Sequence, residues 1–496
     1  MNQAPLEPIQ KAANPYHILL KESIDRFLSE YRNGVTDFCH FRLIFSRLLQ
    51  NLPDPPLEIV WFYSATIFHS NKLSIDQDPL SGVSIAKDLF QLLVSCSDSC
   101  GSLTRIGILA PVVYELYCLV VEKKYLNMVE SLLEGLISYC SICCGQEELH
   151  ENTDELVGLE WGLMDVIPVW MVDKSGSVDY LKDFFPIITD QFRKMIKMGC
   201  GIGLLAGVVM CEAFLLRLCL KFESGTSQAE LEKYLPSLVV QMMTGFRNRS
   251  FFDNIFRMLL EPVFPVTSIL SSENVVVLKE ILYDAVMLVE YPFLNSQTQL
   301  LLPGRLLKEL AVSWLFVADI AIQYVRDKGY QEKTISYLKA FCESCIPLQL
   351  INWVTNQPSI GGKISIQNVS TPVALIKWLL LSEVQGVTVF NNDTAKLRAK
   401  SLICKSEVDP VLPVIKHFHN NLGNNLFSDA AGGGREEYKF DDDIEMVDSI
   451  NNRFLAADGR MDSSTDGTRK RKEWVKDESK IQFKFVKYQC YENSAK

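Results

Sequence analysis

The fold is predicted by residues 181–196, LKDFFPIITDQFRKMI, in which the apolar side chains recur every three or four residues. Residues at that spacing share one face of an α-helix, whereas a strand would need strict alternation. The apolar stripe consists of Leu181, Phe184, Phe185, Ile188, Phe192, Met195 and Ile196. We therefore predict one continuous amphipathic helix from Lys182 to Met198.

Similar stripes occur through most of the chain up to about residue 420. One runs from Leu20 to Tyr31 and the next from Phe38 to Leu48, with the turn signal Asn33-Gly34 between them, so this region is predicted to be a helical hairpin. Strand-like alternation is confined to three short segments, 364–369, 387–390 and 481–486. The chain is predicted to be all-α.

The length and the helix rhythm indicate how these helices are organised. A chain of 496 residues exceeds the roughly 250–300 residues at which a single core stops growing, so it forms several domains or one elongated array. Prolines and polar turns cut the stripes so that a helix pair takes about 40–45 residues, the repeat length of HEAT and armadillo arrays. An irregular helical domain, or two such domains, would show the same periodicity.

On this rhythm, residues 1–420 resemble the armadillo/HEAT type of α-solenoid. The resemblance implies a right-handed superhelical array of antiparallel helix pairs. It also implies a long surface suited to binding other proteins. No position carries a motif of these families, so the resemblance transfers no functional residue.

The composition changes near residue 420. Residues 435–468 hold ten acidic and four basic side chains, and apolar residues are too sparse in 429–475 to offset the entropy of ordering. We predict a disordered segment at 421–480, acidic and then basic, and a short terminal segment at 481–496 able to dock. The acidic residues expected to dock on a basic partner are Asp441, Asp442, Asp443 and Glu445.

The tail also contains four consecutive cations, Arg469, Lys470, Arg471 and Lys472. Short basic runs in an exposed segment are recognised as nuclear localisation signals. The alternative is a solubilising charge run that balances the preceding acids. We expect a nuclear or nucleo-cytoplasmic protein, with a cytoplasmic location as the alternative.

A basic and aromatic cluster occurs at 247–257. Arg247, Arg249 and Arg257 alternate with phenylalanines that also fit a plain helix stripe. If the arginines line the inner face of a superhelix, they form a groove for an acidic peptide or RNA. Otherwise they are solvated side chains on a core helix. Nucleic acid is not the favoured ligand, because the net charge of the chain is −11.

Two motifs suggest cofactor chemistry, and their context argues against both. Residues 201–206, GIGLLA, match the dinucleotide fingerprint, but the preceding segment is predicted to be a helix rather than the required strand. The pairs Cys140/Cys143 and Cys342/Cys345 lie about two hundred residues apart, far beyond the spacing of a zinc ribbon. We expect no cofactor and no metal.

One segment, 198–220, has the composition of a candidate membrane helix. It carries Glu212 and Arg217, and its uncharged part is shorter than the roughly 20 residues that a span requires. We predict a buried core helix and no membrane span. The fourteen cysteines lie mainly in apolar stripes and no signal segment is evident at the amino terminus, so the thiols are expected to be reduced.

These features favour a non-catalytic helical-repeat scaffold or adaptor that binds protein partners. The sequence does not predict the partners or the oligomeric state. Two other function classes stay open: an enzyme or a cofactor- or zinc-binding protein with an unrecognised site, and a membrane-associated protein that uses residues 198–220. The chain has only six histidines and lacks the usual nucleophile, zinc-helix and phosphate-loop motifs.

Overall fold

The computed structural model describes nine ranges of the chain. All of them belong to the first of two compact units, Met1–Pro413. The predicted segments 421–480 and 481–496 lie outside the described residues. The described ranges are 15–74, 81–145, 163–174, 179–199, 201–224, 227–291, 304–357, 370–391 and 393–408.

The described residues form α-helices and no β-strand, which confirms the all-α prediction. Of the three strand-like segments, only 387–390 is described, and it is an irregular connection between two helices. A short 3-10 helix, Pro265–Ser268, follows α13. In chain order the helices are α1 (Pro15–Arg32), α2 (Cys39–Asn51), α3 (Leu57–Ser74), α4 (Ser81–Cys96), α5 (Ser102–Gly107), α6 (Ala110–Val121), α7 (Leu126–Gly145), α8 (Leu163–Trp170), α9 (Tyr180–Phe184), α10 (Asp190–Lys197), α11 (Ile202–Glu223), α12 (Gln228–Gly245), α13 (Arg249–Leu260), α14 (Ser272–Leu288), α15 (Gly304–Asp327), α16 (Gln331–Glu343), α17 (Cys345–Thr355), α18 (Pro372–Val384) and α19 (Asp393–Val408).

The hairpin predicted near the amino terminus is present as α1 and α2. Gly34 ends the first helix with a φ of +78°, a left-handed conformation that glycine adopts without a Cβ penalty. Phe27 of α1 is fully buried and lies 4.6 Å, centroid to centroid, from the ring of Phe38, directly before α2. The apolar stripes read from the sequence therefore face each other across the hairpin.

The continuous helix predicted for Lys182 to Met198 is wrong, because the structure divides this segment into α9 and α10. Pro186 has no N–H group, and its ring disfavours a helical conformation of the residue before it. Phe185 accordingly leaves the helix with φ −119° and ψ 76°. Most of the apolar stripe is nevertheless buried. The spacing therefore predicted correctly which side chains are buried, although they belong to two short helices.

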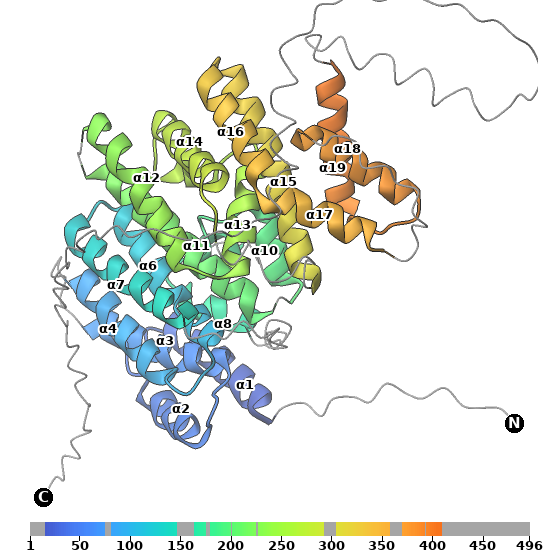
Figure 1. The fold of residues 1–496 in the computed structure, drawn as a ribbon. Helices are drawn as coiled ribbons and strands as arrows, with labels where there is room; N and C mark the ends of the chain where they lie inside the picture. The colour runs from blue at the N-terminus through green and yellow to red at the C-terminus, as the bar shows by residue number, and fades with distance from the viewer. Residues whose placement is uncertain are drawn as a thin grey trace, which may run out of the picture. The chain divides into compact units, whose positions relative to one another are not determined.

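Helix α11 lies among several other helices and is buried along almost its whole length. It contacts α5, α6, α7, α12 and α13 (Figure 1). Gly207 allows the closest of these approaches, since a Cβ atom there would lie 2.7 Å from the backbone carbon of Ser250, at the start of α13. A glycine at this position in the second turn of α11 is therefore required by packing.

From α11 onward the helices form two series of contacts. In one series α11 packs on α13 and α13 on α15, while in the other α12 packs on α14 and α14 on α16 (Figure 1). Contacts between α11 and α12, α14 and α15, and α15 and α16 join the two series. From α11 to α15, each helix thus contacts the second helix after it, and most of these helices also contact a sequence neighbour.

Candidate functional site

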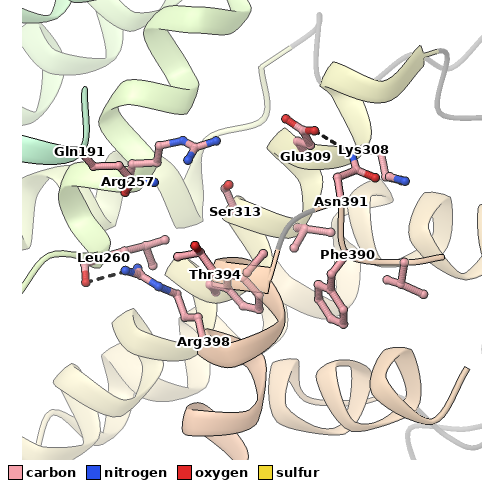
Figure 2. Close-up of a pocket in the computed structure, with 14 residues that line it drawn as sticks. Gln191, Arg257, Leu260, Lys308, Glu309, Ser313, Phe390, Asn391, Thr394 and Arg398 are labelled. Atoms are coloured by element: carbon pink, nitrogen blue, oxygen red, sulfur yellow. Dashed lines mark hydrogen bonds between the residues drawn. The ribbon is translucent and has the colours of Figure 1, made fainter. Parts of the chain in front are cut away.

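A pocket opens between α10, α13, α15 and the beginning of α19, with about 600 Å³ of space that is partly open to solvent (Figure 2). Three cationic side chains and one carboxylate line it, together with hydroxyl, amide and apolar groups. The lining residues are Gln191, Arg257, Leu260, Lys308, Glu309, Val312, Ser313, Phe316, Val389, Phe390, Asn391, Thr394, Ala395 and Arg398.

Helix α13 positions Arg257 in this pocket. The side chain of Asn248 caps the helix by accepting the N–H of Phe251 at 3.0 Å, which satisfies one of the unpaired donors of the first turn. The phenylalanines of α13 are buried in the core, which places Arg257 at the pocket. Its Nε donates to Oδ2 of Asp253, one turn earlier, at 2.7 Å. Burial raises the pKa of Asp253, and the adjacent Arg257 opposes that rise.

The second arginine, Arg398, comes from α19. Its Nη1 lies 3.5 Å from the carbonyl oxygen of Leu260, at the end of α13, and its Nη2 lies 3.9 Å from Oε1 of Glu261. Figure 2 shows Arg398 directed toward Leu260 while Arg257 extends on the side of Ser313. Burial lowers the pKa of Arg398, and the carboxylate of Glu261 acts against this effect.

Helix α15 and the connection before α19 complete the wall. Nδ2 of Asn391 donates to Oε1 of Glu309 at 2.7 Å, which ties the connection to α15 (Figure 2). The ammonium group of Lys308 lies over the ring of Trp353, 4.4 Å from its centroid, an arrangement typical of a cation–π contact. The charge of Lys308 is therefore partly engaged at the rim, whereas Arg257 presents its guanidinium to the interior.

The structure separates the three arginines that the sequence grouped as a groove. Arg257 lines the pocket, whereas the exposed Arg247 and the half-buried Arg249 are not among its lining residues. The helical spacing explains this result, because Arg249 and Arg257 are more than two turns apart and Arg247 precedes α13. Sequence reasoning missed Lys308, Asn391 and Arg398, which lie 51 to 141 positions after Arg257 and carry no local motif.

The tail residues predicted to act as signals or docking sites cannot be placed in this site. The acidic residues Asp441, Asp442, Asp443 and Glu445 lie outside the described residues. The basic run Arg469, Lys470, Arg471 and Lys472 lies outside them as well.

The two cofactor-like motifs are parts of helical structure. Gly201 precedes α11, and the element before it is α10, not a strand. The pair Cys140/Cys143 is buried on α7, which contacts α4, α5, α6, α11 and α12, whereas Cys342 and Cys345 lie on α16 and α17. Within the nine described ranges, no group of three or more His, Cys, Asp or Glu side chains could hold a metal ion.

The prediction of no membrane span is contradicted by the composition of the described helices. Three stretches are long and apolar enough to cross a membrane: Ser102–Val121, which contains α5 and α6, Leu126–Gly145 and Ile202–Glu223. The prediction considered only the last of these and excluded it because of Glu212, Arg217 and its short uncharged part. In the structure Glu212 accepts the N–H of Ile187 at 3.0 Å, and Arg217 pairs with Glu130 and Glu134 of α7.

No family model matches the chain, and comparisons with curated proteins and with solved structures found no match.

Proposed function

We propose that the chain is a non-catalytic helical-repeat scaffold or adaptor that binds protein partners, with an α-solenoid of the armadillo/HEAT type as its framework. The observation that carries this proposal is the double series of helix contacts from α11 to α16. Stacked helix pairs, in which each pair contacts the next, have this pattern.

Contacts earlier in the chain extend the same pattern. Helix α4 packs on α7 and α7 on α12, which continues one series, while α5 packs on α11 and continues the other. The pocket lies at the series that contains α13 and α15. We place the binding of partners at α13 and α15, the members of this series that line the pocket.

Affinity purification tests the proposal. The full-length chain and a variant lacking residues 421–496 are expressed with a small tag, and bound proteins are quantified. We expect at least one stoichiometric partner that both forms retain, because the helices supply the contact surface. Partners that bind only the full-length chain would move the binding site to the tail, and the absence of any stoichiometric partner would contradict the adaptor function.

A second candidate function is association with a membrane, which the three apolar stretches support by length and composition. Of the window in Ile202–Glu223, 94% is buried within the chain, so insertion would require the surrounding helices to separate or to enter the membrane with it. Extraction of cell membranes with high salt and then with alkaline carbonate distinguishes the two functions. Release by salt argues against insertion, and retention in the pellet after carbonate supports it.

A further inference from the structure

The end of the Arg257 guanidinium group that carries Nη1 and Nη2 is the feature of the pocket that indicates a ligand. Nε is occupied by Asp253 at 2.7 Å, and among the described residues none accepts a hydrogen bond from Nη1 or Nη2. The end of a guanidinium group presents two parallel N–H donors, whose spacing matches the two oxygens of a carboxylate or a phosphate. The pocket thus holds a half-buried bidentate donor directed toward open space.

The charges around the pocket disfavour a ligand group with more than one negative charge. The cations Arg257, Lys308 and Arg398 line it, and three carboxylates accompany them: Glu309 in the wall, Asp253 beside Arg257 and Glu261 beside Arg398. Cations and carboxylates are therefore equal in number. A phosphate dianion would leave two uncompensated negative charges in a partly desolvated space, whereas a carboxylate would leave only one.

The other lining residues indicate which chemical groups of the ligand lie next to its negative charge. Gln191, Ser313, Asn391 and Thr394 supply uncharged polar groups, while apolar side chains form the rest of the uncharged wall. A carboxylate that is bonded directly to a carbon carrying an apolar side chain fits both Arg257 and the apolar wall. The apolar lining residues are Leu260, Val312, Phe316, Val389, Phe390 and Ala395.

We propose that this pocket binds the carboxyl terminus of a peptide whose last residue is apolar, with the carboxylate on Nη1 and Nη2 of Arg257 and the last side chain against the apolar wall. Only the source of the peptide, a protein partner, rests on the proposed function. The site itself is defined by Arg257 and its surroundings.

The test uses the full-length chain and two small probes, N-acetyl-L-leucine and N-acetyl-L-leucinamide, in isothermal titration calorimetry. The probes differ only in the group that meets Arg257. We expect the acid to bind at least about tenfold more tightly than the amide, because hydrogen bonds to charged groups are the strong ones. Equal binding of the two probes, absence of binding by both, or tighter binding of inorganic phosphate than of the acid would overturn the proposal.

Two matched variants locate the effect. Arg257→Gln is expected to remove the preference for the acid. Arg249→Gln, an arginine on the same helix outside the pocket, is expected to keep it. Persistence of the preference in Arg257→Gln would also overturn the proposal. Should that variant lose its helical circular dichroism signal, Ser313→Asp replaces it, since a carboxylate there should repel the acid and spare the amide.

The outcome of the calorimetry does not depend on whether the chain is an adaptor. Binding of the free acid needs no partner protein, so it would support the site even if affinity purification found no stoichiometric partner. Partners captured by a chain that does not distinguish the acid from the amide would support the adaptor function and overturn the pocket assignment.

Discussion

His69 is enclosed by aromatic rings at the junction of α1, α3 and α8. Its side chain is fully buried, and its Nε2 donates to the carbonyl oxygen of Val169 at 2.9 Å. Rings of Phe27, Tyr31 and Trp170 lie within 6.3 Å of its centroid. Burial lowers the pKa of His69 to about 4, with Lys72 adding to the shift and Asp173 opposing it.

The buried histidine predicts that the protein loses stability in mild acid. The unfolded chain binds a proton to His69 near pH 6.5, whereas the folded chain resists protonation until about pH 4. The free energy of unfolding therefore falls as pH decreases through this interval, by on the order of 3 kcal/mol from this side chain. Urea unfolding followed by circular dichroism at pH 7, 6 and 5 measures the slope.

The variant His69→Gln separates this contribution from that of other groups. Glutamine can still donate to Val169 but does not titrate, so the variant should be less stable at pH 7 and show a shallower loss below pH 6.5. His40→Gln is the control, since 37% of the His40 side chain is exposed. An equal pH slope in His69→Gln and the wild type would show that His69 is not responsible.

At the scale of elements, the approach of α11 to α13 depends on a single missing side chain. An added Cβ at Gly207 would lie 2.7 Å from both the backbone carbon and the Cβ of Ser250. Backbone atoms cannot move aside as the end of a flexible side chain can. The two helices would have to separate.

Gly207→Ala should therefore destabilise the protein by about 1–3 kcal/mol, the usual cost of overpacking. The matched control is Gly135→Ala in α7, where an added Cβ meets no atom within 4 Å. That change should stabilise by roughly 0.5–1 kcal/mol, because alanine loses less backbone freedom in a helix. Thermal unfolding of both variants checks the opposite signs; a neutral Gly207→Ala would mean that the helices can shift freely.

The break between α9 and α10 is the element that sequence periodicity misjudged. The apolar spacing continued across Pro186, since burial of the stripe does not require an unbroken helix. Pro186 was visible in the sequence. A break at this proline also requires a hydrogen-bond acceptor for the backbone N–H that no longer pairs within a helix. Glu212, on α11, supplies this partner by accepting the N–H of Ile187.

At the scale of the whole molecule, we propose that the chain enters the nucleus through the basic run Arg469–Lys472. Replacing these four residues by alanine should lower the nuclear fraction of a fluorescent fusion, because the run of adjacent cations is lost. The control removes the same number of charges at scattered positions, Lys476, Lys480, Lys484 and Lys487. Unchanged distribution in the first variant, or an equal shift in both, would contradict the proposal.

The candidate site shows where local pattern stops being informative. Arg257 was identified because it stands within a basic and aromatic cluster, but the same cluster also suggested Arg247 and Arg249. Lys308, Asn391 and Arg398 line the same pocket as Arg257 because α15 packs on α13, α18 on α15 and α19 on α18. Spacing along a helix reports neighbours within a few turns, and these residues are separated by whole helices.

By itself, the sequence determined that the described chain is helical and which sides of its helices are buried, because a helix repeats every 3.6 residues and apolar side chains avoid water. Only the tertiary structure decided that Pro186 divides a helix, that Glu212 and Arg217 of α11 find partners elsewhere in the chain, and that Arg257 faces open space beside Lys308 and Arg398. These outcomes depend on contacts between residues far apart in the chain, and such contacts leave no period in the sequence.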